Sequence, residues 1–433
     1  MSRFQIVGEA DPDSDPFDRQ RRIEWWKQDA LTGARVMVMG AGAIGNEVLK
    51  NLALLGVGYM FVADFDEVSR SNLSRTVLFR AGDVGRRKAE VAAERTRDLC
   101  VDPGAQVDWF HGDIVWDLGA GVFRRMDLVL GCLDNVETRY AVNRLCWLTG
   151  TPWIDAGIFE LGVRVNVYVP PLPPCHSCGA SSEQRKAGRQ RYACDAFKRR
   201  AYDAGRVATV QVAAALVGAL QAQEAVKLLC GKKPAVGAQV YYQGTLHDFE
   251  VIPLQVNPEC DAHVSFPEVI PVPLGSGATL REFLVYVGHS DRSGEGVVLE
   301  LDDRSFLADF PCRNCGNLIR FDRPPFRIFD DEALCAPCRS GRPPAPPPEG
   351  VVGAKLGRFS LKETPPRLLD LSLEALGIPP LHVVAVRHRR DGHHYYELSG
   401  DEARVLPTLA RRPSRAEGGP PSGQGPIAGP TEV

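Results

Sequence analysis

Residues 34–55 have the sequence ARVMVMGAGAIGNEVLKNLALL, and this stretch decides the fold. It begins with the apolar run Val36–Met39, which is typical of a buried parallel strand. The run leads into a GxGxxG pattern at Gly40, Gly42 and Gly45, and then into an amphipathic helix. The first glycine allows a tight turn, the second lets backbone approach phosphate, and the third lets helix pack on strand. The stretch therefore predicts a nucleotide site.

A second apolar strand supports this interpretation. It covers Met60–Ala63 and is followed by Asp64, Phe65 and Asp66. This position is about 20 residues after the glycines, where such folds have a carboxylate that binds ribose. A dehydrogenase-like NAD site, or a Rossmann fold without a ligand, agrees equally well with this much of the pattern.

The composition limits the class of protein. The chain has 433 residues, of which 44% are hydrophobic and 24% charged, so it is long enough for two or three domains. A formal net charge of −3 predicts neither general nucleic-acid binding nor membrane-surface binding. We found no apolar run near the roughly 20 residues of a membrane span and no signal peptide, so we expect a cytoplasmic protein. Twelve cysteines, several in CxxC pairs, then predict zinc and a reactive thiol.

Strands and helices alternate further along the chain. Asp127–Leu130 and Thr151–Asp155 are apolar strands, and a helix rich in alanine and glutamate begins at Lys88. This alternation predicts a doubly wound, Rossmann-like α/β sheet, whose ligands lie at the carboxyl ends of the strands. Several polar residues follow strands at such ends, namely Asn72, Arg75, Lys88 and Asp134.

Taken together, these motifs resemble the superfamily of the molybdopterin and thiamin adenylyltransferases and the ubiquitin-activating enzymes. The resemblance covers Asp15 to about His263. It implies adenylation of the C-terminal carboxylate of a protein by ATP, and a homodimer. It also implies a role for each matching residue: Gly40, Gly42, Gly45 and Asp64 hold ATP, Asn72, Arg75 and Lys88 contact the triphosphate, Asp134 positions Mg²⁺, and Arg19 reaches the ATP of the neighbouring protomer.

The chemistry of adenylation requires this kind of site. A carboxylate that attacks the α-phosphate brings two anions together, so catalysis is mostly positioning and charge neutralisation. Arg75, Lys88 and a magnesium ion on Asp134 would supply the positive charge. As an alternative, Arg75 and Lys88 are solvated surface charges, which is the common situation for such residues. The role of Arg19 depends on the dimer.

Two cysteine sets predict structural zinc sites. Cys175 and Cys178 form a CxxC pair, and Cys260 and His263 form a CxxH pair well downstream. Each pair is short enough to hold one tetrahedral zinc ion. His176 is a competing ligand, and unconnected buried thiols are the other alternative. The second set has the spacing of a zinc ribbon and consists of Cys312, Cys315, Cys335 and Cys338.

Cys194 lies outside both sets. It follows Arg191 and precedes three cationic residues, Lys198, Arg199 and Arg200. These charges would lower the thiol pKa and favour the thiolate, so we predict a nucleophile. A structural thiol or a ligand of a third metal site is the alternative. The four remaining cysteines, Cys100, Cys132, Cys146 and Cys230, are in apolar surroundings and are expected to be buried small hydrophobes.

The expected domains follow from these motifs. A flexible segment, 1–16, precedes an adenylation domain, 17–263, which contains a crossover segment with Cys194 at 179–206. A partner-binding domain at 264–410 contains the zinc ribbon at 308–342, and the tail 411–433 is expected to be disordered. Within this scheme we also expect a buried helix at Val207–Leu229 and a hairpin with strands Val383–Val386 and His394–Leu398. His388, His393 and His394 flank this hairpin and are expected to be exposed, with metal binding as the alternative.

The leading hypothesis is an activating enzyme for a ubiquitin-like protein, similar to those of bacterial conjugation operons. It would adenylate the C-terminal glycine of its partner, hold it as a thioester on Cys194 and pass it to a conjugating enzyme. One alternative is a sulfur-carrier adenylyltransferase without a cysteine thioester. A second alternative is a zinc-stabilised nucleotide-binding scaffold without catalysis.

Overall fold

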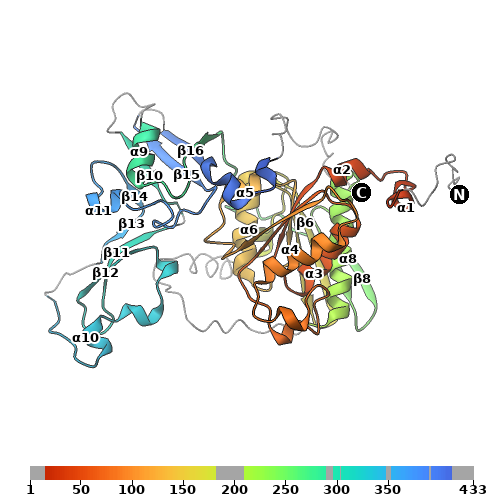
Figure 1. Ribbon diagram of the computed structural model, residues 1–433, viewed down its shortest axis with the longest axis horizontal. Coiled ribbons are helices and arrows are strands. Elements are labelled where there is room, and N and C mark those ends of the chain that lie inside the picture. Colours follow the sequence, from red (N-terminus) through yellow and green to blue (C-terminus); the bar gives the residue numbers. More distant parts are fainter. Residues whose placement is uncertain are drawn as a thin grey trace.

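Three β-sheets organise the protein (Figure 1). The computed structural model describes residues 15–181, 209–288, 296–302, 304–347, 353–389 and 392–411. The largest sheet has eight strands in the order β3-β2-β1-β4-β5-β6-β7-β8. Its strands are β1 (Arg35–Met39), β2 (Tyr59–Asp64), β3 (Gln106–His111), β4 (Leu128–Gly131), β5 (Trp153–Phe159), β6 (Gly162–Tyr168), β7 (Ala238–Gln243) and β8 (Asp248–Pro253).

The first five strands of this sheet are parallel, whereas β6, β7 and β8 continue it antiparallel. The chain starts in the middle, at β1, and moves first to β2 on one side and later to β4 on the other. Such a reversal of strand order opens a crevice at the carboxyl ends of the central strands, where doubly wound folds bind their ligands. The predicted Rossmann-like α/β fold is confirmed.

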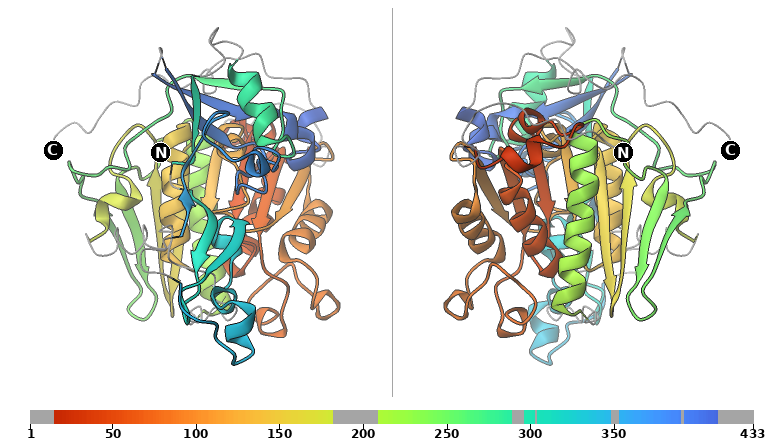
Figure 2. Two further views of the ribbon diagram at one scale, coloured as in Figure 1. Left: turned by 90° about the vertical axis from the view of Figure 1, so that its left-hand side faces the viewer. Right: turned by 90° about the vertical axis from the view of Figure 1, so that its right-hand side faces the viewer.

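Helices cover both faces of the sheet (Figure 2). Alternate residues of β1 point to opposite faces, with Val36 and Val38 in one core and Met37 and Met39 in the other. The first core is closed by α3 (Ala43–Leu54), α4 (Lys88–Leu99) and α8 (Gln211–Leu229), and the second by α5 (Ala120–Arg124) and α6 (Val136–Thr149). Two short helices, α1 (Asp18–Arg21) and α2 (Gln28–Thr32), precede β1, and short 3-10 helices lie at Arg70–Asn72, Ala81–Asp83 and His176–Gly179.

The long helix α8 begins later than its sequence predicts. Val210 is its N-cap with an extended backbone, so the helix starts at Gln211 rather than Val207, and residues 207–208 lie outside the described residues. By length and composition the helix could cross a membrane, which the sequence analysis did not anticipate. In the structure it packs on α3, β5 and β6, and 56% of its most apolar stretch is buried.

Strand β3 and helix α5 were not predicted. In β3, Asp108 interrupts the apolar pattern that marks the other strands. The structure explains why a carboxylate is tolerated there, because Asp108 accepts hydrogen bonds from Tyr59 Oη at 3.0 Å and from Thr408 Oγ1 at 2.8 Å. Both partners come from distant segments, so the sequence near Asp108 could not indicate them.

A five-stranded sheet follows in the order β14-β10-β15-β16-β9. Its apolar face packs on α9 (Leu280–Gly288) and α11 (Pro366–Leu369) in a core of its own. The predicted hairpin near the C-terminus is confirmed as the pair β15 and β16. The strands are β9 (Val269–Val272), β10 (Val297–Glu300), β14 (Arg358–Phe359), β15 (Val383–His388) and β16 (Gly392–Leu398).

The third sheet is small and has the order β12-β11-β13. It consists of β11 (Phe306–Pro311), β12 (Leu318–Arg323) and β13 (Lys355–Leu356), next to α10 (Ala336–Arg339) and the 3-10 helices Pro325–Arg327 and Asp330–Ala333. Its core contains only a few buried side chains, Leu307, Phe321, Ile328 and Ala333. A core of this size favours stabilisation by a metal ion.

The end of the described chain returns to the first sheet. After the 3-10 turn Ser399–Asp401, α12 (Glu402–Val405) and the turn Leu409–Arg411 pack beside α5. Leu381, Leu406 and Leu409 share a core with Met37 and Tyr59. The first sheet ends at Pro253 and the second begins at Val269, but the C-terminal part contributes side chains to the core of the first sheet. The domain boundary near residue 263 stays a prediction.

Candidate functional site

The glycine loop between β1 and α3 has the geometry that its sequence predicts. Gly40 has φ +93°, and a Cβ atom there would lie 2.4 Å from the carbonyl oxygen of Cys132. A Cβ atom at Gly45 would lie 1.9 Å from the carbonyl oxygen of Gly40. In contrast, a Cβ atom at Gly42, the N-cap of α3, would have no heavy atom within 4 Å. The loop thus presents open space at the N-terminus of α3, where backbone N–H groups favour an anion.

Asp64 ends β2 and holds this loop. Its Oδ2 accepts the N–H of Ala41 at 2.7 Å, and its Oδ1 accepts the N–H of Asp66 at 2.7 Å. The side chain is 7% exposed. Burial raises the pKa of the Asp64 carboxyl, whereas the charge of Lys88 and the two N–H bonds act in the opposite direction. The carboxylate therefore joins the end of β2 to the start of the glycine loop.

Lys88 is the first residue of α4 and points to the same edge of the sheet. Its Nζ lies 2.8 Å from Asp66 Oδ2, and its N–H donates to the carbonyl oxygen of Asp66 at 2.9 Å. The residue is 9% exposed, so it is not the solvated surface charge that we considered as an alternative. An ammonium group in so little water interacts more strongly with a bound anion than a surface lysine does.

Asn72 and Arg75 lie on the segment between β2 and α4. Asn72 is buried, and its Oδ1 accepts the N–H of Ser69 at 2.9 Å. Arg75 is half-buried, and its guanidinium donates to the carbonyl oxygen of Ser71. Both side chains therefore have local partners that fix the turn.

Asn46 is a site residue that the sequence analysis missed. It is fully buried on α3, and its Nδ2 donates to the carbonyl oxygens of Ala41 at 2.8 Å and Gly42 at 3.0 Å. Its Oδ1 accepts the N–H of Leu78 at 2.9 Å. Asn46 thus joins the glycine loop to the segment that carries Arg75. The available signal was an amide side chain directly after the third glycine, on a helix face that is otherwise apolar.

Asp134 follows β4 at the same end of the sheet. The side chain is exposed, and its Oδ1 lies 3.3 Å from Asn135 Nδ2. Asn135 in turn caps α6 by accepting the N–H of Thr138 at 2.8 Å. A solvent-facing carboxylate beside the glycine loop has the oxygen ligands that Mg²⁺ prefers, so Asp134 fits the predicted magnesium position.

A buried ion cluster contacts the loop that carries Asp134, at the neighbouring residue Leu133. Arg139 donates through Nε to Asp155 Oδ1 at 2.7 Å and through Nη2 to the carbonyl oxygen of Leu133. Arg164 Nη1 lies 3.1 Å from the other oxygen of Asp155. On the opposite face, Gln221 Nε2 donates to the carbonyl oxygens of Gly131, the last residue of β4, and of Ile154, near the start of β5. None of these side chains was assigned a role from the sequence.

Arg19 does not join the site of its own chain. It is exposed on α1, which is placed by Phe17 against Gly56 and by Gln20 against the carbonyl oxygen of Leu55. These contacts lie at the C-terminal end of α3, whereas the glycine loop is at its N-terminal end. The twelve residues of α3 separate the two ends by about 18 Å. Among the predicted nucleotide residues, the structure links the glycine loop to Asp64, and Asp64 through Asp66 to Lys88. Asn72, Arg75 and Asp134 have local partners, and their roles at the nucleotide stay predictions.

Comparison with known proteins agrees with this geometry. Residues 17–262 match the ThiF family. The chain belongs to this family. A SAMP-activating enzyme E1 of Haloferax volcanii is 34% identical over 239 residues, which cover 54% of this chain and 81% of that protein. A sulfur carrier protein adenylyltransferase of Thermus thermophilus is 32% identical over 247 residues, which cover 54% of this chain and 83% of that protein. A crystal structure of Escherichia coli MccB has 20% identity and a TM-score of 0.48, covering 59% of this chain and 74% of that chain.

The first cysteine cluster lies within the residues that match the family, except for His263, which is one residue beyond them. The metal-ligating atoms of Cys175, Cys178, Cys260 and His263 all lie within 4.8 Å of one another. Cys175 Sγ is 3.6 Å from Cys260 Sγ and 3.8 Å from Cys178 Sγ. Four ligands around zinc at about 2.3 Å would place sulfur atoms about 3.8 Å apart, so the set fits a tetrahedral ion.

His176 is not part of this cluster. Its ring contacts Tyr140, Trp153 and Tyr168 instead. Burial lowers the pKa of His176 to about 4, which keeps the ring neutral at physiological pH. The alternative that His176 replaces a ligand therefore does not agree with the structure.

The second cluster lies beyond the residues that match the family. Cys312 and Cys315 are in the turn between β11 and β12, and Cys335 and Cys338 are at α10. Their sulfur atoms are within 4.8 Å of one another, and Cys315 Sγ is 3.7 Å from Cys335 Sγ. Two knuckles that converge in this way fit the zinc ribbon spacing of the sequence.

The other cysteines divide into two groups. Cys194 lies outside the described residues, so its role as a nucleophile stays a prediction. Cys132, Cys146 and Cys230 are buried as expected, and burial raises the pKa of each thiol. Cys100 is only half-buried.

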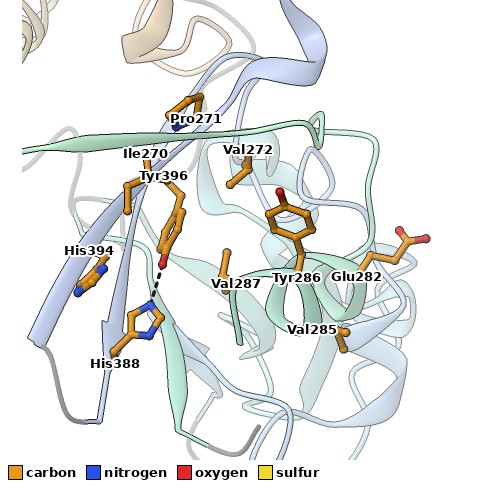
Figure 3. Close-up of a pocket in the computed structure, with 10 residues that line it drawn as sticks. All are labelled: Ile270, Pro271, Val272, Glu282, Val285, Tyr286, Val287, His388, His394 and Tyr396. Carbon is orange, nitrogen blue, oxygen red and sulfur yellow. Dashed lines mark hydrogen bonds between the residues drawn. The ribbon is translucent and has the colours of Figure 1, made fainter. Parts of the chain in front are cut away.

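A separate hollow lies in the five-stranded sheet (Figure 3). It has a volume of about 880 Å³ and lies between α9 and strands β9 and β16. His388 lines it and is 5% exposed, with Nε2 at 2.9 Å from Tyr396 Oη, so the expectation that His388 is exposed was wrong. His393 is exposed, and its Nε2 lies 2.9 Å from Glu300 Oε2. Apolar side chains such as Val285 and Tyr286 form the opposite wall.

Proposed function

We propose that this ThiF-family protein is an ATP-dependent enzyme that adenylates the C-terminal carboxylate of a small protein. The observation that carries the proposal is the convergence of three features at one sheet edge. These are the open glycine loop, the carboxylate of Asp64 that holds it, and the buried ammonium of Lys88 beside Asp66. A nucleoside triphosphate needs such hydrogen-bond donors and cations at the carboxyl ends of the strands.

The proposal assigns each site residue a role that follows from its position. Asp64 would bind the ribose, and the backbone at Gly42 would approach the phosphates, with Lys88 and Arg75 neutralising their charge. A carboxylate oxygen of the partner then attacks the α-phosphorus and forms an acyl–phosphate anhydride. The bond between the α-phosphorus and its bridging oxygen breaks, and pyrophosphate leaves with the electron pair. Magnesium, held by Asp134, would supply further charge neutralisation.

In the finer form of the proposal, the partner is a ubiquitin-like protein. The thiolate of Cys194 attacks the carbonyl carbon of the adenylate, a thioester forms, and AMP leaves with its electron pair. The thioester then passes to the cysteine of a conjugating enzyme. Support comes from the cationic residues near Cys194 in the sequence and from the name of the Haloferax volcanii relative, a SAMP-activating enzyme.

A sulfur-carrier adenylyltransferase is the second candidate. The Thermus thermophilus relative bears that name and matches this chain to a similar extent as the SAMP-activating enzyme. Both candidates use the same nucleotide site. They differ in the step after adenylation, since only the first requires a thiol at Cys194.

One experiment separates these candidates. The purified protein is incubated with MgATP, radiolabelled pyrophosphate and small proteins that end in glycine, encoded beside its gene. Return of label to ATP that depends on one of these proteins would support adenylation. If no label returns with any of them, the alternative of a nucleotide-binding scaffold without catalysis is favoured. With that partner, a thiol-sensitive adduct on a non-reducing gel should be absent in Cys194→Ala. If Cys194→Ala retains both exchange and adduct, the thioester at Cys194 is wrong.

Arg19 and the metal clusters complete the proposal. Because Arg19 lies far from the glycine loop of its own chain, it would act on the ATP of a second protomer in a homodimer. Mixing Arg19→Ala with Lys88→Ala should then restore exchange that neither variant has alone.

We further propose that both cysteine clusters bind zinc ions that stabilise the fold. A cytoplasmic location stays a prediction.

A further inference from the structure

Residues 112–119 form a segment that runs from the nucleotide site to α5. Its first residue, Gly112, donates its N–H to the carbonyl oxygen of Asp64 at 3.4 Å. The segment then folds into a closed turn, because Asp113 Oδ1 accepts the N–H of Val115 at 3.0 Å and Asp117 Oδ2 accepts the N–H of Asp113 at 3.0 Å. The start of this segment is therefore bonded to the backbone of Asp64, the residue whose carboxylate would bind ribose.

Arg304, from the C-terminal part of the chain, holds the middle of the segment. Its Nη2 donates to the carbonyl oxygen of Val115 at 3.0 Å, and its Nη1 donates to that of Trp116 at 2.9 Å. The same Nη1 lies 2.7 Å from the carbonyl oxygen of Gly377, and the guanidinium is 5.5 Å from the centre of the Trp116 ring. One planar group thus joins two carbonyls of the segment to a carbonyl of the C-terminal part.

Two neighbouring contacts strengthen this junction. The ring of Phe326 stacks on Trp116 with a centroid distance of 4.3 Å and an interplanar angle of 6°. Arg327 Nη2 lies 3.7 Å from Asp117 Oδ1, and its Nη1 donates to the carbonyl oxygen of Glu374 at 3.0 Å. Phe326 and Arg327 lie in the 3-10 turn that follows β12, within the predicted zinc ribbon.

The far end of the segment is held as closely. A Cβ atom at Gly119 would lie 2.2 Å from the carbonyl oxygen of Pro380, so the two backbones are in direct contact. Gly121, in α5, donates its N–H to the carbonyl oxygen of Leu381 at 2.8 Å. Only glycine permits this approach, which places α5 against the C-terminal part. The segment is thus bounded by Asp64 at one end and by Leu381 at the other.

We propose that the C-terminal part of this chain sets the affinity of the nucleotide site by holding residues 112–119, with Arg304 as the positioning residue. This inference rests on the proposed ATP site. The residues that match the ThiF family end at 262, so the hold comes from a part of the chain outside the family match. The C-terminal part would then act on the site through the segment whose first residue bonds to the backbone of Asp64.

The physical reason is the cost of ordering a segment. A segment held at several points spends most of its time in one arrangement, so little further order is needed when nucleotide binds. Without Arg304, the carbonyls of Val115 and Trp116 lose the hydrogen bonds that this guanidinium donates, and the segment samples more arrangements. The apparent affinity for nucleotide then falls in proportion to the fraction of molecules whose segment is in the binding-competent arrangement. By linkage, a partner that shifts the C-terminal part would change nucleotide affinity, and nucleotide would change the affinity for that partner.

The test measures MgATP binding to the full chain by calorimetry, together with hydrogen exchange of residues 112–119 without nucleotide. We expect Arg304→Ala to weaken MgATP binding by about tenfold, in the range typical of coupling between sites, and to speed exchange in the segment. Two variants are matched controls. Arg358→Ala removes an arginine that pairs with Glu300 at 3.1 Å on the same C-terminal sheet. Leu373→Ala weakens the core of that sheet at a fully buried residue.

The outcomes are distinct. Weaker binding and faster exchange in Arg304→Ala alone would support the inference. It is overturned if Arg304→Ala binds as tightly as the wild type, or if Leu373→Ala weakens binding by the same factor, because general loss of stability would then explain the effect. If the wild type binds no MgATP, the proposed ATP site fails instead, and hydrogen exchange alone decides whether Arg304 holds the segment.

Discussion

Lys88 Nζ lies 2.8 Å from Asp66 Oδ2, and this pair places a buried ammonium group at the edge of the sheet where β2 ends. The pairing makes the charge of Lys88 available at a defined position before any nucleotide arrives. Asp66 has a more exposed side chain than Lys88, so the ammonium is the more deeply placed member of the pair. Preorganised charge of this kind contributes most when it faces charge that develops during reaction.

Lys88→Ala should therefore reduce pyrophosphate exchange strongly. We expect a decrease of about 10²- to 10³-fold, as for the loss of one preorganised donor in other enzymes. Lys233→Ala, which removes an exposed lysine near the end of α8, is the control and should leave exchange unchanged. Equal exchange rates in the two variants would show that Lys88 has no part in the reaction.

The pH dependence of nucleotide binding should identify Asp64. Burial raises the pKa of its carboxyl above the ordinary value, so it protonates earlier than an exposed aspartate as pH falls. Protonation removes an acceptor from the N–H of Ala41 or Asp66, and affinity should decrease. The ratio of MgATP affinities of wild type and Asp64→Asn cancels the titration of ATP itself. This ratio should shrink towards one with falling pH, and a constant ratio would contradict the assignment.

The same pKa shift has the opposite sign for stability. Because the folded-state pKa of Asp64 lies above the unfolded value, its contribution to stability is complete below the unfolded pKa and is lost as pH rises through the folded pKa. Asp64 thus costs stability at the pH at which its charge would serve nucleotide binding.

Metal content should respond to each cysteine cluster separately. Purified protein is expected to contain zinc at both sets, measured by elemental analysis. Cys178→Ser should remove the metal of the first cluster only, and Cys315→Ser that of the second only. Each loss should lower the melting temperature, because metal binding contributes to folding energy. Cys146→Ser, which changes a buried thiol outside both clusters, should keep all the metal.

The contact between the C-terminal part and α5 should be important for stability. Glu397 is 2% exposed and pairs with Arg124 and, at 2.6 Å, with Arg125. Removing this carboxylate leaves two guanidinium groups close together, so Glu397→Gln should reduce the free energy of unfolding by roughly 2–4 kcal/mol. Glu402→Gln breaks a more exposed pair with Arg125, and its effect should be at most about 1 kcal/mol. Urea denaturation of both variants gives the comparison, and equal effects would contradict this assignment.

Local motifs account for what could be predicted of the nucleotide site. Gly40, Gly45, Asp64 and Lys88 are close in the sequence, and the consecutive elements β1, α3, β2 and α4 bring them to one edge of the sheet. The cysteine pairs are a special case. Cys175 and Cys260 are far apart in the chain, but each belongs to a pair whose short spacing implies a shared metal ion. The metal-binding chemistry of paired cysteines therefore predicted the contact between Cys175 and Cys260, although the two residues are far apart in the sequence.

Other features depended on partners that no nearby residue indicates. The carboxylate of Asp108 fits a buried strand because Tyr59 and Thr408 donate to it. Arg304 donates to the backbone of Val115, which lies nearly two hundred residues earlier in the sequence. Arg304 is one of many arginines in the chain, so its residue type did not single it out.

The sequence alone determined the doubly wound sheet, its nucleotide edge and the two clusters of paired cysteines, because strand patterns, glycine spacing and paired ligands act over short stretches. The tertiary structure alone decided that the C-terminal part packs on α5 and holds residues 112–119, and that Arg19 lies away from its own glycine loop. Contacts of this second kind arise when surfaces from distant segments pack together. Their free energy depends on complementary shape and on paired charges such as Glu397 with Arg125, which a linear pattern does not contain.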